Sequence, residues 1–305
     1  MRVKPITVSV MPTFYCESRC EYCYLGSLRN NTMFLDIKML NDRLMEVVKH
    51  GYYIERIEAY GGDITELPET YINGVVDTLL EYSECLVYTG GLNQATKRFH
   101  NINLSVNKGR FDYEDNLRTA KEEDYNIIVT ALPNIIGYSA RYTLSQLNGI
   151  KGYVTFMPYS ASAKNPLHAP FSYAKDVNGV WNFDNFLSRI VMEYVDYRSN
   201  YTFELSNLEI IKDALNGYYN PLMRNNIFIM PSGKFACVQY ENGLEYFKEL
   251  NSIEEWEEEC RKDEILYQKN CAHCEYYMNG CIADHVRDGF CNGCPQTVTW
   301  VKEFA

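Results

Sequence analysis

The sequence predicts an α/β fold in which a mostly parallel sheet forms part of a β/α barrel. Short apolar runs alternate with segments of helix-like apolar spacing through the first two thirds of the chain. Such alternation is typical of β-α-β units with parallel strands. About six strand-plus-helix repeats favour a partial (β/α)6 TIM-like barrel over an antiparallel sandwich.

The composition argues against several classes of protein. Of 305 residues, 46% are hydrophobic and 23% are charged, so we expect a packed core. A net charge of −11 disfavours general binding to nucleic acid or anionic lipid. We find no apolar run long enough to span a bilayer, and Met1–Met11 lacks the apolar stretch of a signal peptide. We therefore expect a cytoplasmic protein, in which clustered cysteines bind metal more often than they form disulfides.

Six apolar runs are the expected strands of the barrel: Ile6–Met11, Ile54–Ala59, Glu84–Thr89, Asn101–Val106, Asn126–Leu132 and Gly152–Pro158. Between them, helix-like spacing predicts the helices Met39–His50, Thr70–Tyr82 and Tyr113–Glu123. Asp36 and Asp112 are the expected N-caps of the first and third of these helices.

The pattern changes after a further expected helix, Phe183–Arg198. Asn226–Met230 and Lys234–Gln239, joined by a Pro-Ser-Gly turn, are expected to form a β-hairpin. Ser252–Lys262 is an expected short acidic helix, and the Gly- and Cys-rich stretch Cys271–Pro295 is expected to be loop. We therefore place a domain boundary near residue 200, giving a barrel domain over residues 1–200 and a cysteine-rich extension over 201–305.

Three cysteines follow the first expected strand within eight residues: Cys16, Cys20 and Cys23. Three thiolates are one short of a closed tetrahedral zinc site or a four-cysteine iron–sulfur cluster, so one metal position would stay open for another ligand. The alternative interpretation is a buried loop or a zinc-binding loop.

This C-x3-C-x-aromatic-C arrangement resembles the signature of the radical S-adenosylmethionine (SAM) superfamily. The resemblance implies that Cys16, Cys20 and Cys23 hold three irons of a [4Fe–4S] cluster, and that SAM chelates the fourth iron. It also implies that Tyr22, at the aromatic position, packs beside the adenine.

Other residues match positions that bind SAM in this family. Gly61, Gly62 and Asp63 follow the second expected strand, where the family has a Gly-Gly-Glu-like motif that meets the methionine amino group. Asp63 is one methylene shorter than Glu, so either the backbone makes the contact or the loop lies closer. Ser105 and Asn107, at the end of the fourth strand, match polar ribose contacts, although strand-end polar residues are equally common without a ligand.

The last quarter of the chain has seven cysteines, and its hairpin and spacings resemble the SPASM or twitch extension of radical SAM enzymes. The resemblance implies one auxiliary [4Fe–4S] cluster, held by Cys271, Cys274, Cys281 and one of Cys291 or Cys294. Cys237 would be a further ligand, and Cys260 is a weaker candidate. The number of auxiliary clusters, one or two, stays open. By spacing alone, the pairs Cys271/Cys274 and Cys291/Cys294 also fit a zinc ribbon.

The resemblance implies reductive cleavage of SAM to a 5′-deoxyadenosyl radical that abstracts a substrate hydrogen atom. The expected substrate is a ribosomally made peptide, modified by a crosslink, a thioether bond or epimerisation. The expected electron donor is a flavodoxin or ferredoxin. Because the cysteine loop begins at residue 16, we expect either a separate leader-binding protein or recognition of the peptide by the edge of the core sheet. The alternatives are a small-molecule dehydrogenase of the sugar-alcohol or aminocyclitol type, a non-catalytic zinc-binding protein and, with less support, a nucleic-acid-modifying enzyme. No residue is assigned a catalytic role from the sequence.

Overall fold

The structure is a computed structural model that describes residues 4–18, 20, 22–107, 110–158, 182–218, 225–241, 244–277, 280–283, 286–287, 290–291 and 293–305. Among these residues, no helix is long and apolar enough to cross a membrane.

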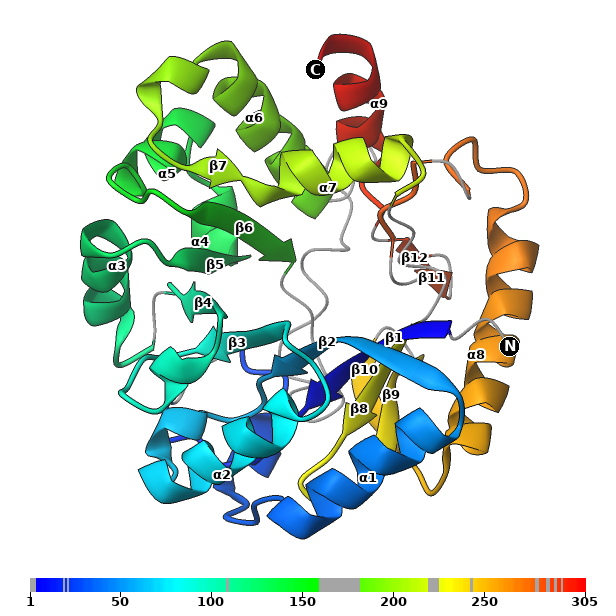
Figure 1. The fold of residues 1–305 in the computed structure, drawn as a ribbon. Helices are drawn as coiled ribbons and strands as arrows, with labels where there is room; N and C mark the ends of the chain where they lie inside the picture. The colour runs from blue at the N-terminus through cyan, green and yellow to red at the C-terminus, as the bar shows by residue number, and fades with distance from the viewer. Residues whose placement is uncertain are drawn as a thin grey trace.

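A single large sheet organises the described part of the chain (Figure 1). Its strand order is β10-β9-β8-β1-β2-β3-β4-β5-β6-β7. From β1 to β7 each strand pairs in parallel with the next, and β8 also pairs in parallel with β1. The strands are β1 Lys4–Val10, β2 Tyr52–Ala59, β3 Leu86–Gly90, β4 Asn101–Ser105, β5 Asn126–Ala131, β6 Tyr153–Pro158, β7 Glu204–Leu205, β8 Asn226–Ile229, β9 Phe235–Glu241 and β10 Leu244–Leu250.

Helices connect the parallel strands and lie outside the curved sheet, as expected for a partial TIM-like barrel (Figure 1). They are α1 Ile37–Lys49, α2 Glu69–Leu80, α3 Tyr113–Glu122, α4 Pro133–Ile136, α5 Ala140–Gln146, α6 Asn182–Asp196, α7 Ser206–Leu215, α8 Ile253–Cys271 and α9 Pro295–Phe304. Two 3-10 helices, η1 Gly26–Asn30 and η2 Ile64–Glu66, lie in the loops after β1 and β2.

The predicted strands and helices of the barrel are confirmed to within a few residues at each end. On α1, the buried residues Leu40, Leu44 and Val47 recur with a spacing of four and three, so one face of the helix packs on the sheet. The predicted N-cap Asp36 is confirmed, because its side chain accepts a hydrogen bond of 2.9 Å from the Met39 amide. Asp112 lies at the N-cap of α3 without a capping bond and instead pairs with Arg110.

The C-terminal third differs from its sequence prediction in two respects. The expected helix Ser252–Lys262 is α8, which continues to Cys271 because its buried side chains, including Tyr267, continue past Lys262. The expected loop Cys271–Pro295 contains a small antiparallel pair, β11 Val286–Arg287 and β12 Phe290–Cys291. The hairpin is confirmed as β8 and β9, and β10 extends it as a further antiparallel strand. The domain boundary at residue 200 stays a prediction, and the sheet crosses it through the pairing of β8 with β1.

A buried carboxylate fixes the C-terminal helix to the barrel. Asp184, in the first turn of α6, accepts hydrogen bonds from the Gln296 amide at 2.9 Å and the Thr297 amide at 3.0 Å. It also accepts a bond of 2.7 Å from the Thr297 hydroxyl. Asp184 therefore acts as an N-cap for α9, although it lies 112 residues before Gln296 in the sequence. Cys294, directly before α9, has a positive φ of 51°, the left-handed conformation that a non-glycine residue rarely adopts.

We predict that Asp184→Ala lowers the free energy of unfolding by about 2–4 kcal/mol, because buried amides of α9 lose their acceptor. Anaerobic chemical denaturation measures this change. Asp196→Ala is the matched control, since Asp196 is exposed at the other end of α6, and we expect it to stay within about 0.5 kcal/mol of the parent. Equal effects of the two substitutions would contradict the capping role.

Candidate functional site

The candidate site lies at the carboxyl ends of β1, β2 and β4, where three loops converge. The loop after β1 carries the three N-terminal cysteines, the turn after β2 carries the glycine pair, and the segment after β4 carries Arg110 and Asp112. The carboxyl ends of parallel strands are where β/α barrels build their sites. The structure therefore brings the N-terminal sequence motifs to the end of the barrel where chemistry is expected.

The cysteine loop holds its thiols largely away from solvent. Cys16 and Cys20 are buried, and Cys23 is half-buried. Arg29 of η1 braces the loop: its carbonyl accepts the Cys16 amide at 3.2 Å, and its guanidinium donates to the Cys20 carbonyl at 3.2 Å. A bond of 3.2 Å from the Cys23 amide to the Cys20 carbonyl closes a turn between these two residues.

Burial favours the protonated form of the Cys16 and Cys20 thiols in the absence of a positively charged ligand. Desolvation, with smaller contributions from Asp63 and Glu66, raises the pKa of Cys16 to about 11. Desolvation also raises the pKa of Cys20. Burial raises the pKa of Tyr22 above its usual range, and the neighbouring Cys20 adds to the effect. Thiols in this setting become good thiolate ligands when a metal centre supplies the missing positive charge.

The glycine pair lets the turn after β2 lie directly against the cysteine loop. The Gly62 amide donates to the Thr13 carbonyl at 2.8 Å, and the Asp63 amide donates to the Tyr15 carbonyl at 2.9 Å. Gly61 has a φ of +139°, which L side chains rarely adopt, and a Cβ at Gly62 would lie 2.0 Å from the Tyr15 carbonyl oxygen. These glycines therefore permit a backbone-to-backbone contact within the chain.

Asp63 belongs to a buried ion-pair cluster that its motif did not predict. One carboxylate oxygen lies 2.8 Å from the Arg110 guanidinium, and the other accepts bonds from the Thr65 amide at 3.1 Å and hydroxyl at 2.6 Å. Arg110 also pairs with Asp112 at 2.8 Å. Although burial alone would lower the pKa of Arg110, Asp112 and Asp63 raise it, so the guanidinium stays charged.

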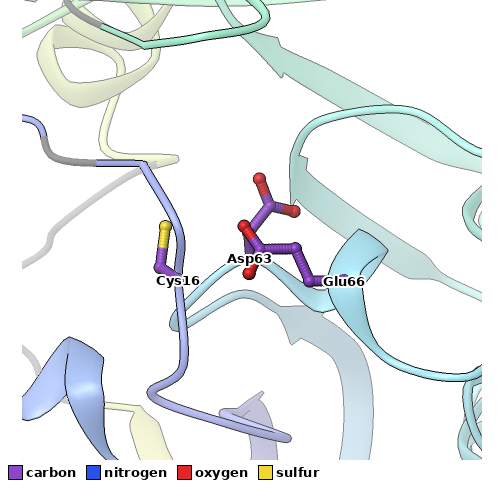
Figure 2. Close-up of side chains that lie close together, drawn as sticks. All are labelled: Cys16, Asp63 and Glu66. Atoms are coloured by element: carbon purple, nitrogen blue, oxygen red, sulfur yellow. The ribbon is translucent and has the colours of Figure 1, made fainter.

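A second carboxylate reaches the cysteine loop from the same turn. Glu66 ends η2, and Figure 2 shows its side chain beside Asp63 and close to Cys16. The Cys16 sulfur and carboxylate oxygens of Asp63 and Glu66 all lie within 4.8 Å of one another. Burial raises the pKa of Glu66, while the Glu17 amide, which donates to both of its oxygens at 2.8 and 3.0 Å, opposes this shift. Glu66 was not predicted as a site residue from the sequence. The one indication of it in the sequence is its position, three residues after the Gly-Gly-Asp motif.

The remaining N-terminal candidates have structural partners. The Asn107 side-chain oxygen accepts the Thr130 amide at 2.5 Å, which fixes the end of β4 to β5. Ser105 is half-buried at the end of β4, and its carbonyl accepts the Asn116 side chain at 3.1 Å. The cofactor contacts expected of Tyr22, Gly61, Gly62, Asp63, Ser105 and Asn107 stay predictions.

The C-terminal cysteines lie on several elements. Cys237 is buried on β9, Cys271 is the buried last residue of α8, and Cys281 is buried after it, whereas Cys274 is exposed. Cys294 is buried directly before α9, and Cys291 lies on β12 with a side chain outside the described residues. Within the described part, no three of these sulfur atoms lie within 4.8 Å of one another, the reach of a single ion. Their roles as ligands stay predictions.

Two sizeable cavities lie at the opposite end of the barrel. One of about 760 Å³ is lined by Lys4, Tyr52 and Ile54, at the amino ends of β1 and β2. The other, of about 470 Å³, is lined by Asn101, Asn126 and other residues that begin β4 to β6. Neither is lined by a cysteine. The chemistry of the side chains therefore favours the cysteine loop over these cavities as the candidate site.

No protein-family model and no curated protein sequence matches this chain. Solved structures match it by fold. The structure of anSMEcpe with bound AdoMet and Cp18Cys peptide has 13% sequence identity and a TM-score of 0.63, over 99% of this chain and 96% of that one. Streptococcus suis SuiB bound to S-adenosylmethionine has 14% identity and a TM-score of 0.57, over 99% and 75% of the two chains.

A third match is Streptococcus suis SuiB bound to the precursor peptide SuiA, with 15% identity and a TM-score of 0.51. It covers 76% of this chain, which spans 59% of that SuiB chain. SuiB and anSMEcpe are radical SAM enzymes. At such low identity the likeness concerns the fold, and it agrees with the parallel strand order of the sheet. The chain therefore has the fold of the radical SAM enzymes.

Proposed function

We propose that this chain is a radical SAM enzyme that modifies a ribosomally made peptide. One observation carries the proposal: in a chain with the radical SAM fold, Cys16, Cys20 and Cys23 lie in the loop that follows β1, at the carboxyl end of the barrel. Three thiols there would ligate three irons of a [4Fe–4S] cluster and leave one iron for SAM.

The surroundings of the loop fit such a cluster. Cys16 and Cys20 are buried, and Cys23 is half-buried. The Ser18 hydroxyl lies between them in sequence, is buried, and has no hydrogen-bond partner among the described residues. Since a buried polar group without a partner is costly, an additional group beside the loop would explain its position.

When bound and reduced, such a cluster supplies the electron that cleaves SAM to methionine and a 5′-deoxyadenosyl radical, which abstracts a hydrogen atom from the substrate. The chain itself has to fix the geometry and exclude water. Arg110, with Asp63 and Asp112, fixes two of the loops together. The Gly61–Gly62 contact fixes the cysteine loop against the turn after β2.

An auxiliary cluster is the further part of this proposal. Cys271, Cys274, Cys281 and one of Cys291 or Cys294 would be its ligands, and Cys237 a candidate for another position. Cys294 has a left-handed backbone conformation, which a non-glycine residue keeps mainly where its surroundings require it. This conformation supports a specific role for Cys294 at its position. An electron donor of the flavodoxin or ferredoxin type would serve the N-terminal cluster.

The substrate class rests on the matched folds. SuiB has been solved with a precursor peptide and anSMEcpe with a peptide. These peptide complexes of SuiB and anSMEcpe support a peptide as the first substrate to test here.

We predict that Cys20→Ala, purified without oxygen, forms no 5′-deoxyadenosine from SAM and dithionite. The parent should hold about eight irons after reconstitution, and the variant about four fewer, because only the N-terminal cluster is lost. Iron analysis and chromatography of the nucleoside measure both. Cys85→Ala, outside the loop, should match the parent. Deoxyadenosine formation by Cys20→Ala at the parent's rate would contradict the proposal.

A second prediction concerns the contact between the two loops. Gly62→Ala places a Cβ 2.0 Å from the Tyr15 carbonyl oxygen, a backbone atom that no side-chain rotation can move. We expect a loss of about 1–3 kcal/mol in unfolding free energy and reduced iron uptake at the N-terminal site. Gly137→Ala is the control, because its nearest contact would be 3.6 Å away. Normal iron uptake by Gly62→Ala would show that the contact between the two loops is not required for iron binding at the N-terminal site.

The substrate class has its own test. Peptides translated from short reading frames next to the gene are incubated with reconstituted protein, SAM and dithionite, and analysed by high-resolution mass spectrometry. We expect a SAM-dependent mass change or hydrogen exchange in one peptide, absent with Cys20→Ala. Deoxyadenosine formation that is stimulated by small sugar alcohols and by none of the peptides would contradict the peptide assignment.

A further inference from the structure

Asp63 has little capacity left for a ligand in this structure. Its side chain has no exposed surface, and both of its oxygens accept hydrogen bonds from within the chain, from Arg110 and Thr65. The Asp63 carboxylate would have to break its ion pair with Arg110 before it could accept a hydrogen bond from an amino group.

The same bonds make Asp63 the cap of η2. Its oxygen accepts the Thr65 amide, two residues further along, in the short-range pattern that Asp makes readily. Glu is one methylene longer and is not favoured in this turn. The capped turn ends at Glu66 and directs its carboxylate to the cysteine loop (Figure 2).

Glu66 has the properties that Asp63 lacks. It is half-buried, lies within 4.8 Å of the Cys16 sulfur, and has no ion pair with a Lys or Arg among the described residues. Its hydrogen bonds come from the Glu17 amide. A carboxylate has about four lone-pair sites, so it can accept further donors. Arg110 pairs with Asp63, and its charge is already shared with Asp112.

We infer that Glu66, and not Asp63, is the carboxylate that accepts a hydrogen bond from the amino group of SAM. Asp63 is then a positioning residue, which shapes η2 and holds Arg110. The Ser18 hydroxyl, two residues after Cys16, is an independent sign of a ligand at this loop, because it is buried and has no hydrogen-bond partner among the described residues. This inference rests on the proposed function.

The test is anaerobic equilibrium dialysis of reconstituted protein with SAM and with 5′-deoxy-5′-methylthioadenosine, which lacks the amino acid part. We expect Glu66→Gln to bind SAM about ten- to a hundredfold more weakly, the effect of losing a charge-assisted hydrogen bond. Binding of methylthioadenosine and iron content should match the parent. Glu69→Gln is the matched control, because Glu69 is exposed three residues later, and it should bind both nucleosides as the parent does.

Three results would overturn the assignment. Glu66→Gln could bind SAM as tightly as the parent, it could lose both nucleosides equally, or it could lose iron, which would make the carboxylate a metal ligand. Failure of the proposed function is distinguishable, because then the parent itself takes up iron without binding SAM.

Discussion

The site depends on one backbone contact, in which the turn after β2 lies against the loop after β1. Two amide-to-carbonyl bonds, from Gly62 to Thr13 and from Asp63 to Tyr15, join segments that are about 48 residues apart in sequence. The absence of a side chain at Gly62 allows this approach. This contact holds the cysteine loop against the turn, and it places the carboxylates of Asp63 and Glu66 close to the Cys16 thiol.

Electrostatics then determines what the site can accept. Arg110 is buried and its charge is shared by Asp63 and Asp112, so these three groups together are anionic. Glu66 adds another carboxylate beside Cys16. Thiols in such surroundings stay neutral until a positively charged centre arrives, which favours a metal cluster and an amine over a free anion. Asp184 fixes the start of α9, directly after Cys294, to α6 through buried hydrogen bonds.

Much of the barrel could be predicted from the sequence, because buried parallel strands are apolar runs and α1 shows its buried face as a repeat. The cysteine loop was visible because its three cysteines lie within eight residues of one another in the sequence. Glu66, Arg110 and Asp184 were not predicted as functional or bracing residues, since each acts through a partner that only the fold brings near. Arg110 meets Asp63 across 47 residues, and Asp184 meets Gln296 across 112. The motif residue Asp63 was assigned to the cofactor, whereas its observed bonds are internal.

We propose that the thiols of the β1 loop hold an iron–sulfur cluster with one iron open to SAM. Electron paramagnetic resonance of the anaerobic, dithionite-reduced protein, recorded with and without SAM, is the decisive measurement. We expect one iron–sulfur signal to shift when SAM is added, and we expect Cys20→Ala to lack this signal while the auxiliary signal persists. A parent spectrum that SAM leaves unchanged would contradict it.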